Sequence, residues 1–559
     1  YGQAIAVDSQ GSIYVIGVDT ESVDFPSTSG AVWDWEGEGG SSTDVFVVKL
    51  TPTVLRESYQ VSYATQVGGT DWDYTYSTIG TVDDSGNVYI TGETQSPDFV
   101  GTGGTVPDDY QVFVVKIATG RASEERRPLI FLPGLTGSRI YTPQGFIWSQ
   151  PDGHGGIYEH TYEADDEIWI NPVAIASFGA DDFFDTLRLQ KDGVTQSTNA
   201  LYGVDLEARD IVGNVWPFDV YNNLLSVLQS VGYQSEVDLF AFPYDWRLDI
   251  SHNAQLLDDK VLNALEIVNG TSDQSQWNIT QVDIVAHSMG ASVAREYISY
   301  PAQAVHVHRL IAVGPVFLGA PKPLKGILFG DTLVPSLNPD EAKDIVQNMP
   351  GAFQVSPGNG YWEFYDGTSG NPVAFQEEYD FDGDNQELGD LSYDQFKSLL
   401  FGLDRDPNLN WDVYGKDINQ TVFDMAEAFH NRLDFSWDSG IPIPEVDLIV
   451  GTGLCTIGQY QSTWRIKAGP VRIDPIVHVN EVNGDGTVPL FSASLYDPDR
   501  CIDQRVGANV YYVAKKYSNH ALLLSKEPIR QLVLNLLAAN SNLPDGIIQE
   551  AGVPRKCWG

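Results

Sequence analysis

The stretch that decides the fold reads VDIVAHSMG and covers residues 282–290. Its apolar first half is typical of a short buried strand, and the helix-like segment 291–300 follows it. A serine between small residues at such a strand-to-helix turn is the pattern of a nucleophile elbow, although Ala286 replaces the first glycine of the usual G-x-S-x-G. The turn would place the hydroxyl of Ser288 at the N-terminus of a helix, where negative charge is favoured. Taken alone, the stretch also fits an ordinary buried strand followed by a helix.

Two later loops supply what a serine nucleophile needs, which is a base and an acid that orients the base. Asp485 lies in the tight loop NGDGTVP (483–489), and His520 lies in YSNHA (517–521), just before an amphipathic helix. In sheet-based hydrolases the order along the chain is Ser, acid, His. Asp485 could also be a structural turn residue, and His520 a surface or capping residue. Together, however, Ser288, Asp485 and His520 predict a catalytic triad, with His478 as the alternative base.

An upstream segment predicts the oxyanion hole. The sequence PLIFLPGLTGS (128–138) is typical of a buried strand that continues into a glycine-rich loop. The glycines of this loop would let the backbone turn so that an N–H group faces the reaction centre. In an oxyanion hole this N–H acts together with that of the residue after the nucleophile. We therefore expect the backbone amides of Leu135 and Met289 to be the donors, with a neighbour of Leu135 in the loop as the alternative.

Several motifs recur in a fixed order along the chain. They are PLIFLPGLTGS (128–138), YNNLL to VGY (221–233), AFPYDWR (241–247), AHSMG (286–290), LGAP (318–321), GDGTVP (484–489) and Asn519 with His520. Their order and spacing resemble those of the lecithin:cholesterol acyltransferase family, which includes lysosomal phospholipase A2 and the phospholipid:diacylglycerol acyltransferases. The resemblance extends from about residue 127 to about residue 537, and PYDWR is its most specific mark.

This resemblance implies an α/β-hydrolase fold with lid and cap insertions, in which Ser288, Asp485 and His520 form the triad. It implies activity on the ester bonds of lipids, including phospholipids: an acyl-enzyme forms, and water or an alcohol then accepts the acyl group. The expected partners are a lipid or membrane-surface substrate and an acyl-acceptor alcohol, and no cofactor is expected. Two alternatives are a triacylglycerol lipase or carboxylesterase, and a surface binding or adhesion protein with a vestigial hydrolase domain. The intact triad argues against the second alternative.

The hydrolase domain is expected at residues 128–545, followed by a C-terminal tail at 546–559. Two long insertions are expected within it, at about 140–210 and about 324–444, and both are rich in aromatic residues.

Four residues are candidate lipid contacts. Trp148 and Trp169 lie in the first insertion, and Tyr244 and Asp245 belong to the PYDWR motif. Exposed aromatic side chains in such an insertion could dock on a lipid surface. The alternative, which we favour for any single tryptophan, is that it packs the cap onto the core.

The charge of the chain limits its possible partners. Its 559 residues include 76 acidic and 32 basic side chains, which gives a formal net charge of -44. Nucleic acid is therefore excluded as a partner, and docking on an anionic membrane would have to depend on apolar contacts. No run of 18 apolar residues occurs, so no transmembrane helix is expected. The sequence does not predict an oligomeric state.

The chain has three cysteines, all in its C-terminal part. Members of the family that the chain resembles carry a disulfide around the acid loop, which implies a Cys455–Cys501 bond here. Such a bond would indicate an oxidising compartment. The lid disulfide of that family is absent because no cysteine precedes Cys455, and Cys557 would be unpaired.

One acidic segment resembles the start of a calcium loop. Asp380, Asp382 and Asp384 alternate in DFDGDN (380–385), but the glycine is misplaced for an EF-hand. Because such clusters arise easily in a strongly acidic chain, we expect no metal.

Residues 1–118 form a separate, strand-rich segment that repeats. Segment 6–17 aligns with 81–92, and segment 45–50 aligns with 112–117. Each unit predicts short strands joined by hairpin turns, and it resembles bacterial β-propeller repeats of secreted proteins. Two units cannot close a propeller, so we expect an incomplete propeller, a linker at 119–127, and a chain that is a piece of a longer protein. Its expected location is secreted or in the cell envelope.

Overall fold

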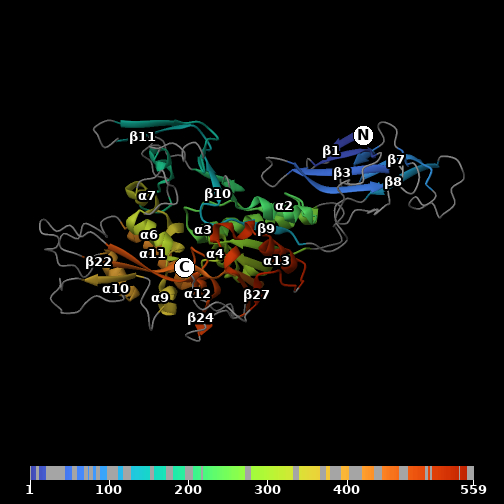
Figure 1. The fold of residues 1–559 in the computed structure, drawn as a ribbon. Coiled ribbons are helices and arrows are strands. Elements are labelled where there is room, and N and C mark those ends of the chain that lie inside the picture. The colour runs from blue at the N-terminus through green and yellow to red at the C-terminus, as the bar shows by residue number, and fades with distance from the viewer. Residues whose placement is uncertain are drawn as a thin grey trace. The chain divides into compact units, whose positions relative to one another are not determined.

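The computed structural model of the chain divides into two compact units (Figure 1). The first comprises Tyr1–Pro128, Asn222–Phe240 and Asn263–Thr280, and the second comprises Leu129–Tyr221, Ala241–Leu262 and Gln281–Gly559. The structure describes residues 2–7, 12–19, 44–52, 59–67, 73–74, 80–82, 88–96, 111–117, 127–151, 157–171, 181–194, 206–215, 218–270, 279–330, 339–365, 373–377, 392–401, 418–433, 444–464, 476–497, 502–503, 507–540 and 542–549.

The N-terminal part of the first unit contains two antiparallel sheets, as the repeats predict. One has the order β1-β2-β3-β4, and in the other β7 pairs with β5, β6 and β8. The strands are β1 (Gly2–Val7), β2 (Ile13–Asp19), β3 (Asp44–Pro52), β4 (Tyr59–Val67), β5 (Asp73–Tyr74), β6 (Gly80–Val82), β7 (Val88–Thr94) and β8 (Gln111–Ile117). Ile13 pairs with Leu50, and the aligned residues Val88 and Ile117 pair in the same register. The repeat is therefore one of structure as well as of sequence, while the propeller stays a prediction.

The two sheets bury opposite faces of the repeat. Val45 and Val47 of β3 are 0% exposed, whereas the aligned Val112 and Val114 of β8 are 75% and 74% exposed. The shared core takes Val45 and Val47 from one sheet and Phe113 from the other. Because successive side chains on a strand point to opposite faces, aligned residues meet opposite environments in the two repeats.

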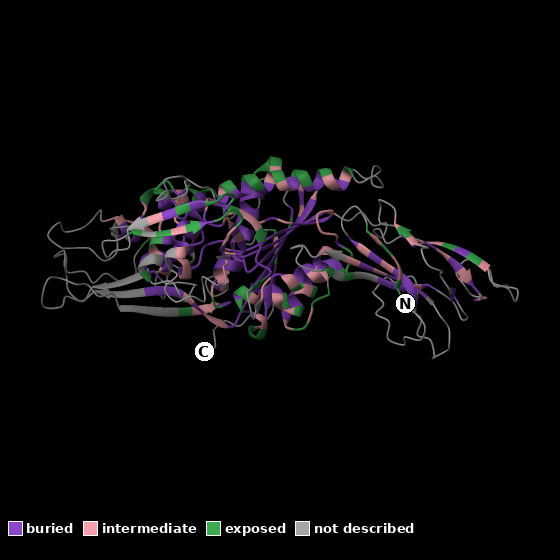
Figure 2. Ribbon diagram, turned by 90° about the horizontal axis from the view of Figure 1, so that it is seen from above, coloured by how far each residue is buried: buried purple, intermediate pink, exposed green. Residues whose placement is uncertain are grey.

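The central sheet has the order β17-β9-β18-β19-β21-β26-β27. Its strands are β17 (Leu239–Ala241), β9 (Leu129–Leu132), β18 (Val282–His287), β19 (Val307–Val313), β21 (Glu445–Gly451), β26 (Ala508–Val513) and β27 (Ile547–Gln549). The pairings from β9 through β26 are parallel, and β27, which lies in the expected tail, is antiparallel to β26. Strands β9 and β18 are buried throughout (purple in Figure 2), which is the burial of a parallel sheet covered on both faces.

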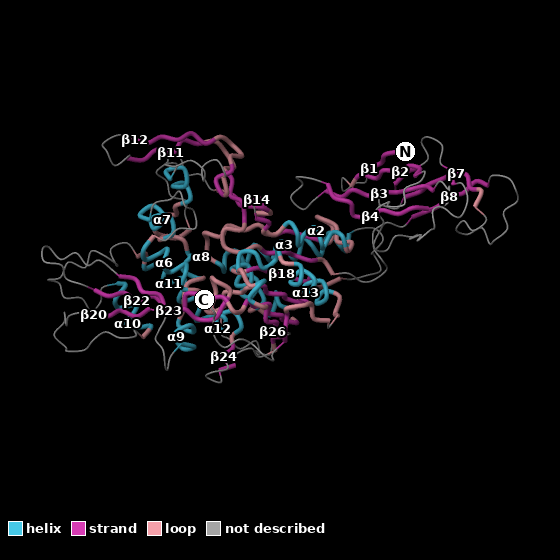
Figure 3. The backbone as a smooth tube through the Cα atoms, viewed as in Figure 1, coloured by secondary structure: helices cyan, strands magenta, loops and turns pink. Residues whose placement is uncertain are grey.

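Helices surround these strands (Figure 3), so this part of the chain has the α/β fold that the sequence predicts. The α-helices are α2 (Asn222–Ser230), α3 (Ile250–Gly270), α4 (Met289–Ile298), α5 (Pro301–Ala304), α6 (Pro321–Phe329), α7 (Pro339–Val346), α8 (Pro350–Gln354), α9 (Asn359–Tyr365), α10 (Tyr393–Phe401), α11 (Gln420–Arg432), α12 (Leu490–Ser494) and α13 (Glu527–Leu537). Short 3-10 helices are η1 (Asp181–Leu187), η2 (Lys515–Tyr517) and η3 (His520–Ser525). None of the described helices has the length and apolar character to cross a bilayer.

Along the chain, two groups of elements come between strands of the central sheet, at the positions where the insertions are expected. Between β9 and β17 the chain forms a sheet of order β13-β10-β14 and two hairpins, and between β19 and β21 it forms α6 to α11. A further sheet has the order β20-β22-β23. The strands are β10 (Ser138–Tyr141), β11 (Phe146–Pro151), β12 (Ile157–Tyr162), β13 (Glu167–Trp169), β14 (Glu207–Ile211), β15 (Asn214–Val215), β16 (Phe218–Asp219), β20 (Val373–Glu377), β22 (Leu454–Trp464), β23 (Ile476–Gly484), β24 (Tyr496–Asp497) and β25 (Ile502–Asp503).

Candidate active site

Ser288 occupies a strained turn between β18 and α4. Its φ of 53° and ψ of -121° lie in a region that non-glycine residues rarely adopt. The turn is held by the Ser288 N–H, which donates to the carbonyl of Val313 at 2.9 Å. A Cβ on Gly290 would lie 2.4 Å from the carbonyl oxygen of Pro133, so a glycine is required for α4 to pack this closely against the end of β9. The predicted strand, turn and helix are therefore all present.

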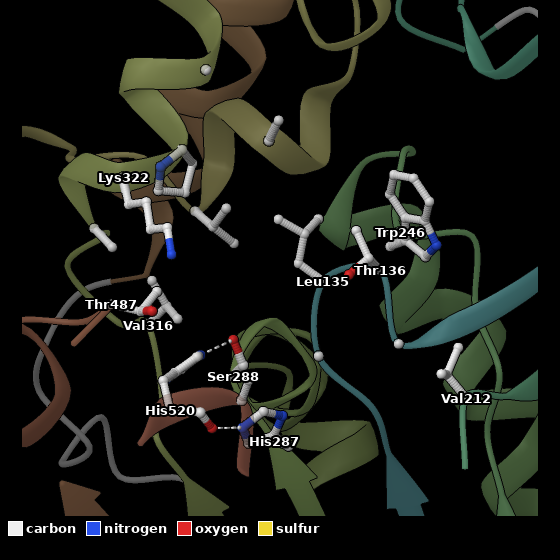
Figure 4. A pocket seen from close by; sticks show the side chains of 18 of the residues that line it. Leu135, Thr136, Val212, Trp246, His287, Ser288, Val316, Lys322, Thr487 and His520 are labelled. Atoms are coloured by element: carbon white, nitrogen blue, oxygen red, sulfur yellow. Dashed lines mark hydrogen bonds between the residues drawn. The ribbon is translucent and has the colours of Figure 1, made fainter. Parts of the chain in front are cut away.

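The structure brings Ser288, Asp485 and His520 together, although they lie far apart in the sequence. His520 Nε2 lies 2.9 Å from Ser288 Oγ (Figure 4), and His520 Nδ1 lies 2.7 Å from Asp485 Oδ2. An ionised carboxylate only accepts hydrogen bonds, so His520 Nδ1–H donates to Asp485. Nε2 is then the lone-pair nitrogen that accepts the hydroxyl proton of Ser288. This is the tautomer that a general base needs.

The acid is fixed by its own loop. The N–H groups of Thr487 and Val488 donate to Asp485 Oδ1 at 3.0 and 2.7 Å, which leaves Oδ2 for His520. Asp485 is 2% exposed, and a Cβ on Gly451 would lie 2.6 Å from its Cβ. Buried and held by these two amides, the carboxylate can accept the Nδ1–H of His520 in one orientation.

The glycine-rich loop after β9 lies against the nucleophile. Gly137 N–H donates to Gly134 O at 2.9 Å and closes the loop, and Thr136 has a φ of 62°. Leu135 and Met289, the predicted oxyanion donors, flank Ser288 from this loop and from the first turn of α4. Within the described part of the chain, neither backbone N–H donates to another residue. Both are thus available to an oxygen atom of a substrate.

Side chains of the PYDWR motif donate hydrogen bonds to the backbone of this loop. Tyr244 Oη donates to the carbonyl of Pro133 at 2.8 Å, and Trp246 Nε1 donates to that of Ser138 at 3.2 Å. Asp245 forms a two-pronged ion pair with Arg247, which is 1% exposed. The motif therefore holds the oxyanion loop in place, and it does so through side chains that are almost entirely buried.

A cavity of about 660 Å³ opens over Ser288 and His520. Its lining is mainly apolar, with Trp169, Phe184 and Leu187 from the first insertion and Ile345, Val346 and Met349 from the second. The ammonium group of Lys322, in the first turn of α6, points into it (Figure 4). Lys322 is the one lysine or arginine among the described lining residues, and none of these is acidic. The site thus combines a large apolar volume with one cation.

Of the four candidate lipid contacts, the structure places one, Trp169, in the lining of this cavity. Trp148 is 1% exposed within the β11–β12 hairpin, which agrees with the packing alternative. Tyr244 and Asp245 lie outside the described lining: Tyr244 bonds the carbonyl of Pro133, and Asp245 pairs with Arg247. On the hairpin, Ile147 and Ile157 face solvent, at 54% and 69% exposed.

Three polar residues of the lining, Lys322, Tyr221 and His287, were given no role from the sequence. His287 precedes the nucleophile, and its ring centroid lies 5.1 Å from that of His520. Burial, and next the charge of His520, lower the pKa of His287 to about 3, so this imidazole is neutral at physiological pH. The position of His287 directly before the nucleophile in the sequence could have identified it as a residue of the site. Lys322 and Tyr221 lie outside the recognisable catalytic loops.

The expected disulfide and the calcium-like segment lie wholly or partly outside the described residues. Cys455 is in β22, opposite Asn483, whereas Cys501 and Cys557 are not described. Asp380, Asp382 and Asp384 are not described either. Among the residues that are, no cluster of histidine, cysteine and acidic side chains could hold a metal ion. The disulfide stays a prediction.

A serine on a strand-to-helix turn of a central parallel sheet, with histidine and acid following in that order, is the arrangement of the α/β hydrolases. The lecithin:cholesterol acyltransferase family model matches residues 165–385, which confirms the resemblance predicted from the motifs. The matched region contains the PYDWR motif and Ser288, and Asp485 and His520 follow it. No curated protein matches the sequence.

Solved structures also resemble the chain, among them the following three. One, the Tle4-Tli4 complex, has a TM-score of 0.44 at 15% identity and covers 74% of this chain and 98% of that chain. The product of gene lin2722 from Listeria innocua has a TM-score of 0.24 at 11% identity, covering 75% and 96%. Aspergillus fumigatus lipase B has a TM-score of 0.19 at 10% identity, covering 56% and 62%.

Proposed function

We propose that this protein is a serine-dependent lipid acyl hydrolase or acyltransferase that cleaves carboxylic esters of phospholipids. The observation that carries the proposal is the hydrogen-bonded series Asp485–His520–Ser288, which ends in a large apolar cavity. The match to the acyltransferase family supports the same substrate class.

In this proposal each group has a role. His520 Nε2 takes the proton of Ser288 Oγ as this oxygen attacks the ester carbonyl, and Asp485 stabilises the imidazolium that forms. The amides of Leu135 and Met289 donate to the oxyanion of the tetrahedral intermediate. The intermediate expels the lyso-lipid alcohol, which takes its proton from His520, and leaves an acyl ester on Ser288. Water or another alcohol, deprotonated by His520, then attacks this ester and releases Ser288.

The lining of the cavity supports an amphipathic substrate with an anionic group. The apolar walls from the two insertions suit an acyl chain, because they would bury its hydrocarbon surface. The protein has a net charge of -44, but the ammonium group of Lys322 gives the cavity a positive charge that can pair with a phosphate. A triacylglycerol or a simple ester has no anion for this lysine to meet.

Product analysis with phospholipid vesicles that carry a labelled acyl chain tests the proposal, with and without an added long-chain alcohol. We expect labelled fatty acid, or labelled ester of the alcohol, from the wild type and from Ser292→Ala. Ser292 lies one turn further along α4, is buried, and donates to the carbonyl of Val316, so it is a matched serine control. Ser288→Ala should yield neither product. Folded wild type that yields neither product, or Ser288→Ala that matches it, would overturn the proposal.

A further inference from the structure

Two buried side chains connect the oxyanion loop to the histidine of the triad. The N–H of Gly134 donates to Tyr221 Oη at 2.9 Å, and Tyr221 Oη lies 2.9 Å from His287 Nδ1. On the far side of the ring, His287 Nε2 lies 3.0 Å from the backbone oxygen of His520 (Figure 4). We call Tyr221 and His287 the Tyr221–His287 bridge.

The proton positions along the bridge follow from the chemistry of its ends. The carbonyl of His520 can only accept, so Nε2 of His287 carries the hydrogen. His287 is buried and neutral, and its Nδ1 is therefore an acceptor. Tyr221 must donate its hydroxyl hydrogen to this nitrogen, and its oxygen accepts the N–H of Gly134. Each donor thus meets one acceptor, and the direction of every bond is determined.

The bridge is almost completely buried. Tyr221 is 2% exposed and His287 is 4% exposed, and burial raises the pKa of Tyr221 above its ordinary value. Water cannot replace a lost partner easily at such a site, so removing one group leaves another buried and unpaired.

Both ends of the bridge are parts of the proposed catalytic machinery. At one end, the N–H of Gly134 is used by Tyr221, so this amide is not available to a substrate and the donor of the loop must be a later residue, for which Leu135 is the predicted one. At the other end, His520 is held through its peptide groups: its N–H donates to Asp485 O at 3.1 Å, and its carbonyl accepts from His287. The imidazole bond to Asp485 then sets the ring orientation and the tautomer.

We infer that Tyr221 and His287 are positioning residues, which hold the oxyanion loop and the general base in register around Ser288. The inference rests on the proposed function. Neither residue transfers a proton to the substrate; each acts through the backbone of Gly134 or His520. Their loss should therefore lower kcat, because an error in the relative position of base and oxyanion hole is felt in the transition state, and should leave KM nearly unchanged.

Tyrosine-to-phenylalanine variants at two sites provide the first test, with a soluble chromogenic ester as substrate. Tyr221→Phe removes the hydroxyl that makes both bonds. Tyr361→Phe is the matched control, since Tyr361 is 0% exposed and its hydroxyl donates to the carbonyl of Gly458 at 2.9 Å, outside the described lining of the cavity. With rates counted per fluorophosphonate-reactive site, Tyr221→Phe should lower kcat about 10- to 100-fold with KM within about threefold, and Tyr361→Phe should change neither. Equal kcat values for the two variants would overturn the inference.

The second test compares two substitutions of His287, one that can replace its hydrogen bonds and one that cannot. It does not require a change at Tyr221. In His287→Gln the side-chain amide keeps one donor and one acceptor, whereas His287→Leu keeps neither. We expect kcat per reactive site to be largely retained in the glutamine variant and to fall about 10- to 100-fold in the leucine variant. Equal kcat values in these two variants would mean that the bridge only packs the core. Wild type without esterase activity would instead contradict the proposed function.

Discussion

Gly134 and Ser288 are in direct contact: a Cβ built on Gly134 would lie 2.9 Å from Ser288 Cβ and 3.4 Å from its Oγ. The oxyanion loop can approach the nucleophile only because residue 134 has no side chain. We therefore expect the following amide, that of Leu135, to face the carbonyl oxygen of a bound ester.

Adding a methyl group at this contact should separate the loop from the nucleophile. For Gly134→Ala we predict a fall in kcat of about 100-fold, the effect expected when an oxyanion donor moves out of reach. Gly270→Ala is the control, since a Cβ there meets nothing within 4 Å. Steady-state kinetics of the two variants checks this, and wild-type kcat in Gly134→Ala would contradict the role given to the loop.

The carboxylate of Asp485 should be essential because it dictates which nitrogen of His520 carries the proton. Asp485→Asn can donate to Nδ1 and so favours the wrong tautomer, and we predict a loss of kcat on the order of 10⁴-fold. Asp447→Asn is a matched change at another buried aspartate, which pairs with Arg309 and accepts from Asn509. It should lower the melting temperature and leave kcat per folded molecule unchanged. If both variants kept wild-type kcat, Asp485 would have no part in the chemistry.

Lys322 should distinguish anionic from neutral substrates. For Lys322→Gln we predict that KM for a phospholipid rises about tenfold, while KM for a neutral ester is unchanged, because one charge-assisted contact is lost. Lys325→Gln, on the same helix but outside the described lining of the cavity, is the control. Equal changes for the two substrates would favour a triacylglycerol lipase or carboxylesterase.

His430 should make the protein less stable in acid. Burial, together with the charge of Arg295, lowers its pKa to about 4 from 6.5, and no described residue bonds its Nε2. The unfolded chain therefore binds this proton at a higher pH than the folded chain does, and the stability that neutral His430 contributes is present above about pH 6.5 and is lost as the pH falls toward 4.

Urea unfolding of wild type and His430→Leu between pH 4 and pH 7 measures this effect. Over that window the free energy of unfolding of the wild type should fall more steeply as the pH drops, by up to about 1.4 kcal/mol per pH unit. Parallel pH dependences would show that His430 titrates normally in the folded protein.

The sequence was informative where the chemistry needs a local pattern. The elbow at Ser288 combines a buried strand, small neighbours and a helix, and the loops of Asp485 and His520 follow in the order of a known mechanism, so the structure could be anticipated there. The start of α13 was also foreseeable, because Pro528 fits the first turn of a helix.

The other features of the site and of the repeats depend on the direction in which a side chain points. The hydrophobic periodicity of the sequence does not determine this direction. Tyr244 was a candidate lipid contact, yet its hydroxyl bonds the carbonyl of Pro133 behind the loop. Tyr221 meets His287 across 66 positions of sequence, and only folding of the sheet brings them together. Similarly, Val112 and Val45 occupy aligned positions of the repeat but differ in burial, since this depends on which face the neighbouring sheet covers.

The most direct test of the account is to react the folded protein with a fluorophosphonate and to identify the labelled residue by peptide mass spectrometry. We predict one label on Ser288, none in Ser288→Ala, and strongly slowed labelling in His520→Ala. No label on folded wild type, or a label on another residue that persists in Ser288→Ala, would contradict the assignment of Ser288 as the nucleophile.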